Sequence, residues 1–143
     1  MGKNYEEGDV MKLDFLDVLN NKINSLGLFT TSTIGLLSEG DSLSIMSMPG
    51  GEETVFFDGA RDKDYQIQVN AKSKNQLNCF DALTEIYQIL ENIDDLPSMN
   101  GSYDFQRVET KSLPNFVGQD EQGFFVYACN LSCKITIYKG VDL

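Results

Sequence analysis

The chain has 143 residues, of which 41% are hydrophobic and 10% aromatic, and this length and composition suit one packed domain better than two. Its formal net charge of −11 argues against direct nucleic-acid binding or an anionic membrane partner, because both depend on clustered lysine and arginine side chains. No apolar run approaches the ~20 residues that span a bilayer, and residues 1–10 lack the basic and apolar regions of a signal peptide, so we expect a cytosolic protein.

Residues 1–10 show no periodic pattern, whereas Met11 begins one. Two interpretations stay open. The segment is a disordered terminus, or it is a leader absent from the natural product, because codons for Glu6-Glu7-Gly8 can spell a ribosome-binding site just before an ATG at Met11. In either case we expect residues 11–143 to form a single α+β domain.

The first predicted helix runs from Lys12 to Leu26, where apolar residues recur at steps of three and four, and Gly27 ends it. Its expected buried stripe is Leu16, Leu19, Ile23 and Leu26. Residues 28–40 mix threonine and serine with apolar positions and predict at most a short strand.

Two turns divide the next segment. Ser42 to Met48 is strand-like, the turn Pro49-Gly50-Gly51 follows, and Thr54-Val55-Phe56-Phe57 is apolar again, which predicts a hairpin or strand pair around that turn. After a second turn at Asp58-Gly59, residues 65–71 alternate strictly between apolar and polar and predict a strand with one buried face.

A second helix is predicted after Ser73 and Gln76, which have capping-box spacing, and it should stop before Pro97. Its expected buried stripe is Leu77, Phe80, Leu83, Tyr87, Leu90 and Ile93. Tyr103 to Ser112 is strand-like. The long charged side chains of Arg107, Glu109 and Lys111 share one face of this strand.

The last predicted strand is unusually long. From Phe124 to Ile137 one face is apolar throughout, while the other changes from apolar to polar, which suggests that its first part is covered and its second part wet. Asp120 to Gly123 predicts a tight hairpin turn. Because strands usually have about five or six residues, we expect the turn end of this hairpin to project beyond the core.

These elements together predict an α+β fold: an antiparallel or mixed β-sheet with two amphipathic helices packed on one face and a long projecting C-terminal β-hairpin.

Cysteine and histidine counts limit the chemistry of the chain. With Cys79, Cys129, Cys133 and no histidine, a closed four-ligand zinc site within one subunit is not expected. On one strand, Cys129 and Cys133 would lie roughly 13 Å apart at about 3.3 Å per residue, beyond disulfide reach. We interpret all three as small apolar core residues. The lack of histidine also removes the commonest hydrolase designs.

Gly50-Gly51-Glu52-Glu53 resembles the central GGEE of cyclic-dinucleotide synthases, in which the backbone approaches a phosphate and the acids hold a metal. The next residue is Thr54 instead of the expected phenylalanine. We interpret the four residues as a solvated turn, and a small nucleotide-binding enzyme remains the less favoured alternative.

Aromatic residues cluster near the predicted turns and hairpin ends: Phe56, Phe57, Tyr103, Phe105, Phe116, Phe124 and Phe125. Two interpretations stay open for them. They cap the core, or some of them form, with Leu113 and Val117, an exposed apolar patch for a partner subunit.

Several landmarks in this order resemble one family. They are the turn Met48-Pro49-Gly50-Gly51, the turn Phe57-Asp58-Gly59, Ser73-Lys74-Asn75 before the second helix, and Pro114-Asn115-Phe116-Val117-Gly118-Gln119-Asp120 with Gly123 before the long final strand. Over most of Met11 to Tyr138 the chain resembles the small "minor capsid" or tail terminator (tail completion) proteins of long-tailed bacteriophages and prophages of Gram-positive bacteria.

This resemblance implies a structural protein without catalysis or cofactor. Such a protein forms a hexameric ring on the end of the tail tube, stops its polymerisation and presents a docking face to the head connector. Ring assembly can be conditional, so the free chain can be a monomer. The resemblance also implies assembly in the host bacterial cytoplasm and a place at the junction of tail and head. Another connector or stopper protein of the same particle is the alternative.

We expect contacts to a neighbouring subunit or to the tail tube from the predicted C-terminal hairpin and the strand face before it. The candidate residues are Arg107, Lys111, Leu113, Phe116, Val117 and Phe124. Lys134 is a further source of positive charge toward an acidic neighbour.

Overall fold

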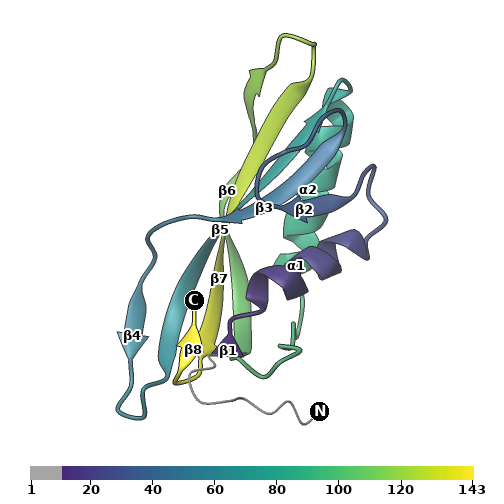
Figure 1. The fold of residues 1–143 in the computed structure, drawn as a ribbon. Coiled ribbons are helices and arrows are strands. Elements are labelled where there is room, and N and C mark those ends of the chain that lie inside the picture. Colours follow the sequence, from purple (N-terminus) through teal and green to yellow (C-terminus); the bar gives the residue numbers. More distant parts are fainter. Residues whose placement is uncertain (1–10) are drawn as a thin grey trace.

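Six strands form one sheet at the centre of the computed structural model, which describes residues 11–143 (Figure 1). Along the sheet the strands are ordered β2 (Ser32–Ile34), β3 (Ser42–Ser47), β5 (Arg61–Ser73), β7 (Phe125–Ile137) and β6 (Tyr103–Gln119), and β4 (Glu53–Val55) also pairs with β5. The short strands β1 (Met11–Lys12) and β8 (Val141–Asp142) pair separately, and the helices are α1 (Phe15–Asn24) and α2 (Gln76–Glu91). Both interpretations of residues 1–10 lie outside the described residues.

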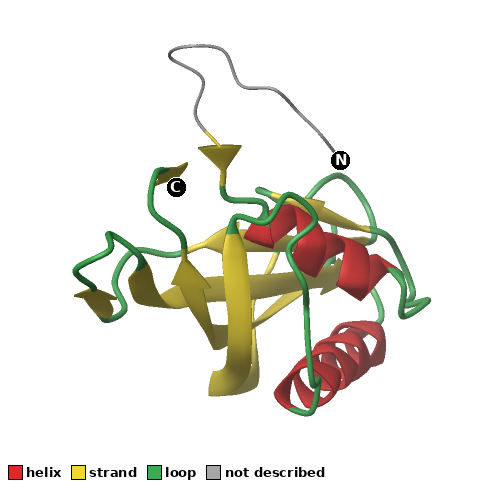
Figure 2. Ribbon diagram, turned by 90° about the horizontal axis from the view of Figure 1, so that it is seen from below, coloured by secondary structure: helices red, strands yellow, loops and turns green. Residues whose placement is uncertain are grey.

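The sheet is mixed. β2 runs parallel to β3, whereas the pairs of β5 with β3, β4 and β7 and the pair of β6 with β7 are antiparallel. Both helices lie beside this sheet (Figure 2). The predicted α+β class with a mixed sheet, two helices and a C-terminal strand pair is therefore confirmed.

The pairing of β5 with β7 is the longest in the sheet, from Arg61 opposite Ile137 to Ser73 opposite Phe125. Alternate residues of both strands face the helices and are buried, as the sequence pattern predicts: Ile67, Val69, Ala71, Cys129, Leu131, Cys133, Ile135 and Ile137. This face is the sheet side of the hydrophobic core.

All three cysteines are buried and free, which confirms their interpretation as core residues. Burial raises the pKa of Cys129 and of Cys133 to about 12. Burial is also the main reason that the pKa of Cys79 is raised to about 11. Their thiols therefore stay protonated and unreactive near neutral pH.

Helix α1 begins three residues later than predicted, because Met11 and Lys12 pair with β8 instead of joining the helix. Its buried residues are Phe15, Val18, Leu19 and Ile23. Leu16 and Leu26, which we predicted to be buried, only pack partly against the core. The ring of Phe15 lies 5.6 Å from that of Tyr65 and 5.2 Å from that of Tyr103 in edge-to-face geometry. These contacts place the Phe15 side of the helix against the sheet.

Helix α2 has a different cap and a different buried stripe from those predicted. Asn75, not Ser73, is the N-cap, and its side chain accepts a hydrogen bond of 3.0 Å from the backbone N–H of Leu77. The buried residues are Cys79, Ala82, Leu83, Ile86 and Leu90. Cysteine and alanine are small, so the helix packs closely on the sheet through them and turns the larger Leu77 and Phe80 outward. The helix ends before Pro97, as predicted.

The predicted hairpin around Pro49-Gly50-Gly51 is wrong. β3 pairs with Ile67 to Lys72 and β4 with Arg61 to Lys63, so both strands follow the same edge of β5 and do not pair with each other. Gly50 and Gly51 have φ angles of +98° and +87°, which shift the chain sideways without reversing it. The second predicted turn, at Asp58-Gly59, does close the β4–β5 hairpin, because the N–H of Gly59 donates to the carbonyl of Phe56.

Strand β6 is longer than predicted and continues from Ser112 to Gln119. Its pairing with β7 contains several register shifts, and Pro114 lies among them. Proline is tolerated there because β6 is at the edge of the sheet, where a missing N–H breaks no ladder. The turn that joins β6 to β7 forms the upper end of the molecule in Figure 1.

Asp14 ties the start of α1 to the loop before β6. Its carboxylate accepts hydrogen bonds from the hydroxyls of Ser98 (2.7 Å) and Ser102 (3.0 Å) and from the backbone N–H groups of Met99 (2.8 Å) and Asn100 (3.1 Å). Asp14 is 9% exposed and Ser102 is fully buried, so water has little access to this contact, whereas the two N–H donors belong to exposed residues.

We expect Asp14→Ala to lower the free energy of unfolding by about 1–3 kcal/mol, because the substitution leaves the buried hydroxyl of Ser102 and three part-buried donors without their acceptor. Urea unfolding followed by circular dichroism measures the change. Asp17→Ala, on the exposed side of the same helix, is the matched control and should change the value by under about 1 kcal/mol. Equal effects of the two substitutions would show that the Asp14 network does not stabilise the fold.

A second comparison uses the adjacent glycines of the β3–β4 link. A Cβ at Gly50 would meet nothing within 4 Å, so Gly50→Ala should cost only the strain of a positive φ, about 1–2 kcal/mol. A Cβ at Gly51 would lie 2.1 Å from the carbonyl oxygen of Asp64, so Gly51→Ala must also displace β5. We expect clearly greater destabilisation by Gly51→Ala in urea unfolding, and a cost no larger than that of Gly50→Ala would contradict this packing.

Candidate functional site

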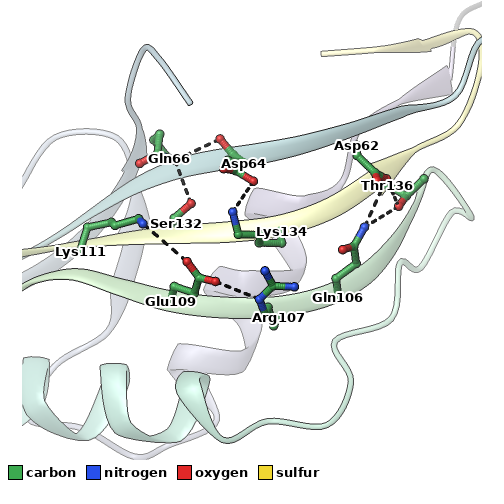
Figure 3. Close-up of polar contacts among 10 residues, drawn as sticks. All are labelled: Asp62, Asp64, Gln66, Gln106, Arg107, Glu109, Lys111, Ser132, Lys134 and Thr136. Atoms are coloured by element: carbon green, nitrogen blue, oxygen red, sulfur yellow. Dashed lines mark hydrogen bonds and ion pairs between the residues drawn. The ribbon is translucent and has the colours of Figure 1, made fainter. Parts of the chain in front are cut away.

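The face of the sheet opposite the helices carries a network of polar side chains (Figure 3). Its members are Asp62, Asp64 and Gln66 on β5, Ser132, Lys134 and Thr136 on β7, and Gln106, Arg107, Glu109 and Lys111 on β6. We call this surface the polar face. It contains two of the candidate contact residues, Arg107 and Lys111.

Hydrogen bonds between β5 and β7 stabilise the centre of the polar face. The ammonium group of Lys134 lies 2.6 Å from a carboxylate oxygen of Asp64, and these side chains are only 18% and 22% exposed. The side-chain amide of Gln66 donates to the hydroxyl of Ser132 at 2.9 Å, and Ser132 is fully buried. The predicted change from a covered to a wet part along this face of β7 is therefore wrong, because polar neighbours cover its second half.

Arg107 and Lys111 form ion pairs within the chain. Both contact Glu109, Arg107 through Nε at 2.9 Å and Lys111 through Nζ at 3.5 Å. The hydrogen bond from Arg107 lowers the pKa of the Glu109 carboxyl. The side chains of Arg107 and Lys111 remain 58% and 52% exposed, so both cations stay accessible from solvent. Exposed pairs of this kind contribute little to stability.

The end of the β6–β7 hairpin exposes apolar side chains. Leu113, Phe116 and Val117 are 61%, 55% and 60% exposed, and we call these three residues the hairpin tip. The ring of Phe116 packs at 5.7 Å from that of Tyr127 and at 6.5 Å from that of Phe125, which orders this surface.

Phe124, the remaining candidate contact, is placed differently. It is half-buried, and the ammonium groups of Lys72 and Lys74 lie 5.4 Å and 5.2 Å from the centre of its ring. Cations at this distance from an aromatic ring are attracted to its face. The contacts with Phe124 thus keep the ammonium groups of Lys72 and Lys74 at the same end of the molecule as the hairpin tip.

The aromatic residues near turns divide between the two interpretations. Tyr103 is buried and donates from its hydroxyl to the carbonyl of Leu96 at 2.6 Å, and burial raises its pKa. Phe105 and Phe125 are half-buried. Tyr103 and Phe105 therefore cap the core, Phe125 packs against Phe116 at the hairpin, and Phe56 and Phe57 are exposed.

Two exposed apolar residues beside the hairpin were missed by the sequence analysis. Leu77 and Phe80, which we predicted to be buried, are 66% and 45% exposed at the start of α2. The hydroxyl of Tyr127 donates to the side chain of Gln76 at 2.7 Å, so this helix end lies beside the hairpin. Nothing in the local pattern distinguishes these residues from buried ones, because their spacing fits an inward stripe.

The Gly50-Gly51-Glu52-Glu53 segment has a structural explanation. Gly51 packs directly on the backbone of Asp64, and Glu53 lies in β4 with its carboxylate 4.0 Å from Lys63. Within the part of the chain that the structure describes, no three histidine, cysteine or acidic side chains gather as a metal site would require.

Neither helix between residues 11 and 143 is long and apolar enough to cross a membrane.

Comparison with known proteins gives one family. The model of a family described as "Bacteriophage tail terminator protein" matches residues 22–137, which is more than half of the chain. The matched range includes the sheet from β2 to β7, helix α2 and the hairpin tip. No curated protein matches the chain.

The ion pairs of the polar face should differ in strength. We expect Lys134→Ala to lower the free energy of unfolding by about 1–2 kcal/mol, because it leaves the largely buried carboxylate of Asp64 without its cation. Arg107→Ala removes an exposed pair and should cost under about 1 kcal/mol. Urea unfolding of both variants tests the order, and a larger cost for Arg107→Ala would contradict it.

Proposed function

Because the chain belongs to the bacteriophage tail terminator family, and is therefore a structural component of the phage tail, we propose that it caps the tail tube as a ring, ends the polymerisation of the tube and joins the tail to the head connector. The observation that carries this proposal is the family match over residues 22–137. In this proposal the ring is a hexamer that assembles on the tube, and the free chain can be a monomer.

The charge of the protein suits a ring around a DNA channel. A formal net charge of −11 repels the phosphate backbone, so a genome that passes through the ring would not be held there. An open channel is a requirement for a protein that closes the growing end of the tube but must still let DNA leave the head.

The exposed residues of the hairpin suit contacts within such an assembly. The hairpin tip presents three apolar side chains that gain from burial against another protein. Arg107 and Lys111 add accessible positive charge farther along the same strand, toward an acidic neighbouring subunit or the tube. We propose these five residues as contacts to a neighbouring subunit or the tube.

A stop codon in this gene within its phage or prophage tests the function. Electron microscopy of the lysate should show abnormally long, unattached tails beside filled heads without tails, because nothing would end tube growth. Expression of the intact chain from a plasmid should restore attached tails of uniform length, which controls for effects on neighbouring genes.

Other outcomes would overturn the proposal. Tails of normal length that fail to attach would show that the protein acts as a connector or stopper and does not end tube growth. Normal particles would remove both assembly functions. Titration of the chain with magnesium and nucleotides would then test the enzyme alternative directly.

A further inference from the structure

The β4–β5 hairpin ends in apolar side chains that are exposed within the described residues 11–143. Val55 and Phe56 are 64% and 44% exposed, and Phe57 is as exposed as in an extended peptide. Together with Asp58 they line a shallow surface hollow. We call residues 53–61 the β4–β5 arm. Its aromatic residues add nothing to the core, so fold stability does not account for them.

The arm is held in a defined direction. β4 pairs with β5 at three positions, from Glu53 opposite Lys63 to Val55 opposite Arg61. The N–H of Asp64 donates to the carbonyl of Glu52 at 2.9 Å, which extends the ladder to the Gly51 link. A surface ordered in advance loses little conformational entropy when it binds, which favours an interface.

The arm and the hairpin tip lie at opposite ends of the molecule (Figure 1). Arg61 of β5 is opposite Ile137 at the arm end, and Ser73 is opposite Phe125 at the tip end. Thirteen residues of extended strand, at about 3.3 Å each, separate the two ends by roughly 40 Å. One copy therefore cannot cover its own tip with its own arm.

Charge is balanced at both ends. The arm end carries the carboxylates of Glu52, Glu53 and Asp58 together with three cations, Arg61, Lys63 and Lys139, of which Lys63 faces Glu53 and Lys139 packs beside Gly59. The tip end carries Lys72 and Lys74, which lie over Phe124, and the turn adds the acidic residues 120 and 121. In a chain of net charge −11, two balanced ends are where copies meet with least repulsion.

We propose that the β4–β5 arm of one copy docks on the hairpin tip of the next copy. The inference rests on the proposed ring and names the surfaces that would form it. Two different patches that meet head to tail make a heterologous contact, which repeats from copy to copy and closes into a ring when the rotation allows. Phe57 is the central side chain of the arm, and Phe116 and Val117 are its acceptors.

A photo-crosslinking amino acid in place of Phe57 tests the docking. Tails are prepared from cells that make this variant together with the wild-type chain, so that rings can form even if the variant is impaired. After irradiation, mass spectrometry should find residue 57 joined to residues 113–117 of another copy. The photo-crosslinking amino acid carries a bulky benzoylphenyl group, so the side chain at position 57 stays aromatic.

The control places the same group at Leu36, which is 83% exposed in the link between β2 and β3 and far from the arm in sequence. It should give no adduct with residues 113–117. An adduct of residue 57 with another tail protein, with another region of the chain or with a second arm would overturn the proposal, as would no adduct at all.

Failure of the proposed function has a separate signature. If immunoblots of purified tails lacked the wild-type chain, the ring itself would be wrong, and the docking with it. If the chain were present and residue 57 made no contact with the tip, the ring could stand and only the arm's role would be overturned.

Discussion

The antiparallel pairing of β5 with β7 sets the arrangement of the other strands and of both faces of the sheet. Thirteen residues of each strand are paired from end to end, so the alternation of side chains keeps its phase over the full length. A shift of one residue in either strand would turn its buried side chains outward and bring Lys134 or Asp64 against the helices. The same pairing therefore fixes the hydrophobic core and the polar face together.

The length of this pairing also explains why apolar side chains stay exposed at both ends of the sheet. Helix α2 has 16 residues and covers about 24 Å at 1.5 Å per residue, whereas the strands extend over roughly 40 Å. At one end the β4–β5 arm keeps its apolar side chains exposed, and at the other the start of α2 lies beside the hairpin but leaves the hairpin tip exposed. A subunit of a phage tail needs surfaces for neighbours, and a sheet longer than its helical layer provides them at two separate places.

Much of the fold could be predicted from periodicity, and the errors have physical causes. Strands with one buried face, such as residues 65–71, repeat every two residues, and a two-residue period leaves only one inward face. A helix repeats every 3.6 residues, so neighbouring stripes are nearly equivalent and tertiary contacts choose between them. This is why Leu77 and Phe80 were assigned to the core. The β3–β4 link was misread because two glycines after a proline suit a reversal as well as a sideways step.

Sequence patterns alone predict the α+β class, the inner face of the central strands and the burial of the cysteines, and sequence comparison identifies the family. The pattern left open whether the aromatic residues near the turns cap the core or form an exposed patch with Leu113 and Val117, and strand length predicted only that the turn end of the last hairpin projects beyond the core. Packing between distant segments decided which helix faces are buried and which strands share the edge of β5. It also decided that Phe56 and Phe57 lie about one strand length from the hairpin tip. Exposure depends on what packs over a residue from elsewhere in the chain, and local sequence does not contain that information.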